Sequence, residues 1–75
     1  MNVTTDEIKA IKPGATEAFN CDVSKMKSLA TVLSTLNTFG SRPDEIVFYE
    51  HKKFPAKNIV IIRAMREGDE PILNK

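Results

Sequence analysis

The sequence predicts an α+β domain in which one helix packs on one face of an antiparallel sheet of three or four strands. Two observations carry this prediction. Apolar residues recur at helical spacing only over residues 24–39, and runs rich in β-branched and aromatic residues flank this segment. The 75 residues leave room for one small core. We therefore expect a single domain over residues 1–66, followed by a charged, flexible tail over residues 67–75.

The first predicted element is a β-hairpin. Residues 7–12 form a short candidate strand, and Pro13-Gly14 supplies a turn because proline fixes φ and glycine accepts positive φ. Residues 16–21 then alternate, with Phe19 and Cys21 on one face. The sequence thus predicts that these two strands pair with each other.

The next element is the helix over residues 24–39, which Asp22 or Ser24 can cap. Gly40 supplies the stop signal, and a turn follows at residues 41–44. The apolar stripe that predicts the helix consists of Met26, Leu29, Ala30, Leu33 and Leu36.

A second hairpin completes the order β-β-α-β-β. Its strands are predicted over residues 45–51 and 57–65, with a break at residues 52–56. Alternation puts Ile59 and Ile61 on one face of the last strand and apolar residues on the other face as well. One helix covers one face, so the second face either meets a partner or carries an exposed apolar patch. The register, and with it the choice of inward face, stays open.

Composition points to a cytoplasmic chain. The formal net charge is +1, and a single cysteine, Cys21, forms neither an internal disulfide nor a zinc site. The first residues show no signal-peptide pattern, and the longest aliphatic run is far too short for a membrane span. We expect no membrane association and no cofactor.

No residue constellation indicates catalysis. His51 is the only histidine, and the sequence places neither a nucleophile nor an orienting partner beside it. Cys21 is better explained as a small core residue than as a nucleophile. The glycines are isolated, and no acidic or imidazole groups show metal-ligand spacing. The sequence therefore favours a small non-catalytic binding module without a metal site.

Positive charge gathers in the second hairpin. Residues 40–66 carry a net charge of +3, against 0 for residues 1–39 and −2 for residues 67–75. The first hypothesis is a nucleic-acid-binding hairpin, in which Tyr49 and Phe54 stack on bases. The competing interpretation is a solvated hairpin whose lysines protect a sheet edge. The candidate phosphate contacts are Arg42, Lys52, Lys53, Lys57, Arg63 and Arg66.

The alternative function is protein interaction through an apolar sheet face, as a homodimer, an adaptor or an inhibitor. It rests on the two strands that are apolar on both sides. The candidate interface residues are Val47, Tyr49, Ile59 and Ile61.

The second half of the chain, from Lys27-Ser28-Leu29-Ala30 through the hairpin to Ile61-Ile62-Arg63-Ala64, resembles short accessory proteins encoded by phages and other mobile elements. Those proteins combine one helix with a hairpin whose last strand ends in an apolar-apolar-Arg pattern. The resemblance covers about half of the chain. It implies a small accessory or regulatory binder, in the host cytoplasm if a phage encodes it, and transfers no site residues.

Overall fold

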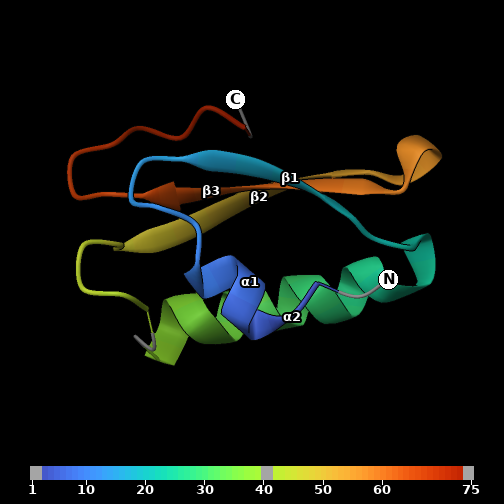
Figure 1. The fold of residues 1–75 in the computed structure, drawn as a ribbon, viewed down its shortest axis with the longest axis horizontal. Coiled ribbons are helices and arrows are strands. Elements are labelled where there is room, and N and C mark those ends of the chain that lie inside the picture. The colour runs from blue at the N-terminus through green and yellow to red at the C-terminus, as the bar shows by residue number, and fades with distance from the viewer. Residues whose placement is uncertain (1–2, 40–41, 74–75) are drawn as a thin grey trace.

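The computed structural model describes residues 3–39 and 42–73. It contains helix α1 (Thr5–Lys9), strand β1 (Thr16–Asn20), helix α2 (Val23–Phe39), strand β2 (Phe48–Phe54), the 3-10 turn η1 (Pro55–Lys57) and strand β3 (Ile59–Met65). The α+β class and the antiparallel sheet are as predicted. Figure 1 shows both helices on one side of the sheet and the C-terminal segment on the other. Gly40 and Ser41, predicted as helix stop and turn, lie outside the described residues, as do the last two residues of the predicted tail.

The predicted strand over residues 7–12 is wrong, because this region contains the short helix α1. The Thr4 hydroxyl caps this helix, because it accepts a hydrogen bond from the Glu7 amide at 3.2 Å. The same hydroxyl donates to the Glu7 carboxylate at 3.2 Å. Ile8 and Ile11, three residues apart, are both buried in the core. Helical spacing therefore explains this pair better than strand alternation does.

The predicted N-terminal hairpin is accordingly absent, and β1 pairs with β3 instead. The sheet order is β1-β3-β2, with β3 antiparallel to both neighbours. Ala18 lies opposite Ile61, and Ile61 lies opposite Lys52 on the far strand. The last strand in the chain is thus the central one, and the sheet has three strands in the described part of the chain.

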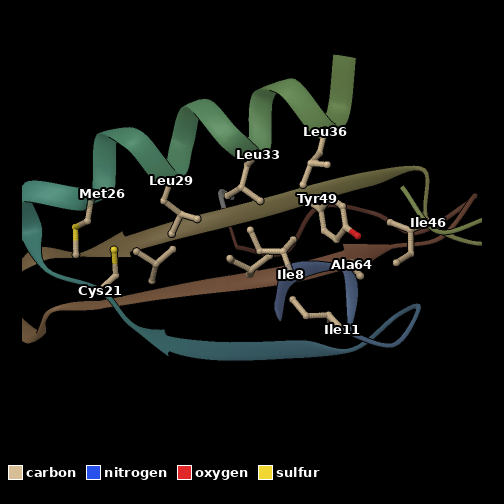
Figure 2. Close-up of a cluster of buried hydrophobic side chains, with 12 residues drawn as sticks. Ile8, Ile11, Cys21, Met26, Leu29, Leu33, Leu36, Ile46, Tyr49 and Ala64 are labelled. Carbon is tan, nitrogen blue, oxygen red and sulfur yellow. The ribbon is translucent and has the colours of Figure 1, made fainter. Parts of the chain in front are cut away.

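The helix α2 confirms the predicted apolar stripe. Its residues Met26, Leu29, Leu33 and Leu36 are buried, and they point toward the sheet in Figure 2. The core between the layers also takes in residues from α1, β2, β3 and the loops, and the partly buried Phe19 of β1 packs against it. It consists of Ile8, Ile11, Cys21, Met26, Leu29, Leu33, Leu36, Ile46, Tyr49, Val60, Ile62 and Ala64.

The second hairpin is present, but its first strand is shifted toward the C-terminus. Ile46 belongs to a turn, with its amide bonded to the Pro43 carbonyl at 3.0 Å, and its side chain is buried. The segment 52–54, predicted as a break, continues β2. The chain reverses only at Pro55, which begins η1, and at Asn58, which has left-handed dihedrals of φ 53° and ψ 42°.

Candidate binding surface

The sheet has one covered face and one open face, and the register assigns each residue to them. Val60, Ile62 and Ala64 of β3 are buried beneath the helices. Because side chains alternate along a strand, the residues between them point the opposite way. We call that side the open face. Its strand residues are Thr16, Ala18, Asn20, Phe48, Glu50, Lys52, Phe54, Ile59, Ile61, Arg63 and Met65.

The C-terminal segment, residues 66–73, lies on one half of the open face (Figure 1). Oε1 of Glu50 accepts hydrogen bonds from the amides of Ile72 at 2.9 Å and Leu73 at 2.5 Å. Arg63 donates to the carbonyl of Glu70 at 2.8 Å. The Glu50 side chain is only 3% exposed as a result. The chain itself therefore covers part of the second sheet face, and the predicted flexibility of the tail stays a prediction.

The other half of the open face, toward the hairpin turn, holds an open hollow of about 190 Å³. It is lined by Ala18, Phe54, Lys57, Ile59 and Ile61, and we call it the open-face hollow. Its wall is apolar apart from Lys57. Lys52 lies beside it, with Nζ 5.7 Å from the centre of the Phe54 ring. The hollow thus combines an apolar floor with two lysines at its rim.

The predicted interface residues separate into two groups. Ile59 and Ile61 lie together in the open-face hollow. Val47 precedes β2 and is 45% exposed, but it does not line the hollow. Tyr49 is fully buried between the sheet and α2, so its assignment to an exposed interface is corrected. Tyr49 faces inward because it pairs with Ala64 on the helix-covered side.

The same burial removes Tyr49 from the candidate base-stacking residues. Burial raises the pKa of the Tyr49 hydroxyl, and the Arg42 charge offsets part of that increase. Within the described residues the hydroxyl has no hydrogen-bond partner. Of the two predicted stacking residues, only Phe54 lies at the surface, where it is half-buried in the hollow wall.

Three of the six predicted phosphate contacts are engaged within the protein. Arg42 closes the end of α2, where the last carbonyls lack helical partners. It donates to the carbonyls of Leu36 at 2.8 Å and Asn37 at 2.6 Å. Arg63 and Arg66 both contact Asp69, at 3.9 Å and 3.2 Å. These arginines stabilise the fold and the C-terminal segment.

The three lysines do not form one cluster either. Lys52 and Lys57 lie at the open-face hollow. Lys53 pairs with Val60, so its side chain projects from the helix-covered face of the sheet, opposite the open face. There it contributes to a lowered pKa of His51, whose main cause is burial of the imidazole. The structure therefore brings together two of the predicted cations, beside Phe54.

The two edges of the sheet differ. At the β2 edge, the Asn37 side chain of α2 accepts from the Tyr49 amide at 2.8 Å and donates to the Tyr49 carbonyl at 3.1 Å. At the other edge, the Ala64 amide donates to the Ala15 carbonyl, and the Cys21 amide donates to the Asn58 carbonyl. These two bonds show that the backbone groups of Ala15 and Cys21, on either side of β1, point toward β3. The alternate residues Thr16, Ala18 and Asn20 direct their backbone groups outward. Among the described residues no hydrogen bond reaches these outward groups.

Sequence reasoning missed the roles of Glu50, Arg42 and Asn37. Glu50 gives little signal in the sequence, because β2 also carries His51 and two lysines and its pattern does not indicate which charge is buried. Arg42 follows the predicted end of the helix, and basic side chains at this place commonly bond the last carbonyls, so its position was a signal. The partner of Asn37 lies on β2, and no local pattern indicates it. Cys21 is a buried core residue, as predicted.

Searches of the described residues for two further features gave no result. No group of three or more histidine, cysteine, aspartate or glutamate side chains is arranged to hold a metal ion. None of the described helices has the length and apolar character needed to cross a membrane. Comparison of the chain with protein-family models, with curated proteins and with solved structures finds no match.

Proposed function

We propose that this protein is a small non-catalytic module that binds another protein through the uncovered half of its open sheet face. One observation carries the proposal. Ala18, Phe54, Ile59 and Ile61 surround an open hollow on a sheet face whose other half is already covered by the chain. An apolar side chain that packs against this wall removes apolar surface from water, which stabilises the complex by roughly 25 cal/mol per Å² buried.

Substitution of adjacent β3 residues separates binding from folding. Ile61 points into the hollow, whereas Ile62 is fully buried under the helices. We expect Ile61→Asp to remain folded and to lose the partner. Ile62→Asp is expected to unfold the chain, because it buries an unpaired charge. Circular dichroism of both variants checks this difference.

A photoreactive residue identifies the kind of partner. Placed at position 57, beside the hollow, it should form protein adducts on irradiation in a cell lysate, and Ile61→Asp should abolish them. Position 27, an exposed lysine on α2, is the matched control. Equal adducts at positions 27 and 57, or adducts that survive Ile61→Asp, would contradict the proposal. Adducts destroyed by nuclease would favour the second candidate.

Nucleic-acid binding is the second candidate, because Lys52, Phe54 and Lys57 share one surface. Phe54 would stack on a base and the two lysines would meet phosphates. Two contacts predict a shallow salt dependence for a single strand, with a slope of about −1.4 in log–log form. Only two lysines lie on this surface, and this small number of cations makes the candidate the weaker one.

Fluorescence anisotropy with single-stranded oligonucleotides tests the second candidate. Lys52→Ala and Lys57→Ala should each weaken binding. Lys53→Ala is a matched control, since Lys53 leaves the other face of the sheet. If Lys53→Ala weakens binding as much as the other two changes, general charge attraction is the cause, and the open face is not a nucleic-acid site.

A further inference from the structure

The open-face hollow reaches the free edge of the sheet. Ala18 is both a lining residue of the hollow and a member of the edge strand β1. Its backbone groups, like those of Thr16 and Asn20, point outward from the sheet. Unpaired edge groups of this kind form a template for another strand. The hollow and the edge of the sheet therefore meet at Ala18.

An antiparallel strand added to β1 would lie about 4.8 Å from it. Side chains opposite Thr16, Ala18 and Asn20 would then point over the open face. The side chain opposite Ala18 would enter the hollow, because the alanine methyl leaves space that Ile59 and Ile61 enclose. Backbone pairing would supply affinity, and the hollow would select one apolar side chain.

Charge defines the chemistry of the flanking positions. Lys57 lines the hollow and Lys52 lies beside its aromatic wall, whereas no acidic residue lines it. Glu50, the acidic strand residue on this face, is held by the amides of Ile72 and Leu73. Lys52 lies on β2, the strand farthest from β1, so Lys57 is the lysine that an acidic side chain next to the apolar one would meet.

We propose that the partner contributes an extended acidic segment, which adds to β1 as a fourth, antiparallel strand and inserts one apolar side chain into the open-face hollow. This inference rests on the proposed function and specifies its partner. A second copy of the chain, or a nucleic acid, would require a different contact. Both are outcomes of the test below.

The probe is the acetylated and amidated peptide Thr-Asp-Thr-Ile-Thr-Asp-Thr, titrated into the full ¹⁵N-labelled chain and followed by NMR. Its isoleucine and aspartates share one face of a strand, and threonine favours the extended conformation. We expect saturable shifts of the β1 and β3 amides. Slower hydrogen exchange is expected at Thr16, Ala18 and Asn20. No shift at millimolar peptide would overturn the inference.

Backbone N-methylation distinguishes strand addition from simple apolar contact. In the proposed register, the amides of isoleucine and both aspartates face β1, whereas the threonine amides face solvent. Methylating the first set should weaken binding at least about tenfold, the equivalent of one or two lost hydrogen bonds. Methylating the amides of the last three threonines, which also adds three methyl groups, is the matched control. Equal binding of both peptides would overturn strand addition. Continued sensitivity to Ile61→Asp would nevertheless leave the proposed function standing.

Two variants of the chain complete the test. Ala18→Leu should fill the hollow and abolish the response to the peptide, whereas Ala10→Leu, the same change at an exposed position beside α1, should not. Lys57→Glu should weaken binding of the aspartate peptide and strengthen binding of a version with lysines in place of the aspartates. Protection of β1 that depends on protein concentration alone would identify a second copy as the occupant. Preference for an oligonucleotide over the peptide would likewise overturn the inference.

Discussion

Glu50 is the residue that ties the C-terminal segment to the sheet. Its Oε1 accepts from two backbone amides, and its Oε2 lies 3.8 Å from Nη1 of Arg63. A buried carboxylate is costly unless donors and an opposite charge surround it. The described residues of the C-terminal segment supply those donors. The order of this segment is therefore linked to the charge of one side chain.

Glu50→Gln tests this link. The amide keeps the shape but loses the charge that strengthens the bonds from Ile72 and Leu73, so we expect a loss of about 1–3 kcal/mol in the free energy of unfolding. Urea denaturation measures it. Glu67→Gln, at an exposed position, is the control and should change stability by less than about 0.5 kcal/mol. Equal effects of both substitutions would contradict the role assigned to Glu50.

The lowered pKa of Asp69 predicts that the stability of the fold depends on pH. The amide of Arg66 donates to its Oδ2 at 2.8 Å, and this bond is the main reason that the pKa of Asp69 is lowered in the folded state. The unfolded state then binds a proton more readily, so Asp69 stabilises the fold above its ordinary pKa. That stabilisation disappears as pH falls through the lowered folded value.

Melting temperatures of the parent chain and Asp69→Asn measure this dependence. The variant should melt lower at neutral pH, and the gap should narrow as the solution becomes strongly acidic. A gap that is independent of pH would show that the substitution acts through shape alone.

At the scale of elements, the turn of the second hairpin depends on one backbone conformation. Asn58 has φ 53°, and its carbonyl accepts from the Cys21 amide at 2.8 Å, so the turn also positions the end of β1. Left-handed dihedrals cost most residues about 1–2 kcal/mol, and asparagine and glycine tolerate them best. The left-handed conformation at position 58 therefore restricts which residues can close this hairpin turn.

We expect Asn58→Val to destabilise the fold by about 1–2 kcal/mol and Asn58→Gly to have a much smaller effect. Thermal denaturation of the two variants gives the comparison. If glycine is as harmful as valine, the asparagine side chain, and not its backbone conformation, is what the turn needs.

The elements also show how much of this fold the sequence could predict. The helix α2 was predictable because its stripe repeats over several turns. In residues 7–12, the pair Ile8 and Ile11 is too short to establish a helical period, and the capping pair Thr4 and Glu7 was the signal that could have identified the helix. The pairing of β1 with β3 joins distant segments, and no local pattern encodes it. Without that register, neither the burial of Tyr49 nor the position of the hollow could be predicted.

At the scale of the whole molecule, burial explains the apolar character of the helix-covered sheet face and of only part of the open face. The helices cover one face, and residues 66–73 cover part of the other (Figure 1). The lysines are divided between the two faces, so the predicted basic hairpin does not form a single basic surface. The described sheet therefore carries one uncovered apolar area and no broad basic surface.

Deleting residues 67–75 tests the domain boundary. The helix-facing core contains no residue beyond Ala64, so we expect the shortened chain to keep a folded NMR spectrum. Its stability should fall by about 1–3 kcal/mol, because Glu50 loses its amide donors. A collapsed or unfolded spectrum would show that residues 67–73 are part of the folding unit.

The central position of β3 also has a consequence for how the chain acquires its structure. Both partners of β3 precede it in the sequence, so no strand pair of the described sheet can form during synthesis until β3 has emerged from the ribosome. The adjacent β2–β3 hairpin closes a short loop and should form first, whereas docking of β1 must close a much longer one. We expect the nascent chain to consist of helical segments with exposed apolar stripes until that moment. This is the interval in which a chaperone would protect it from aggregation.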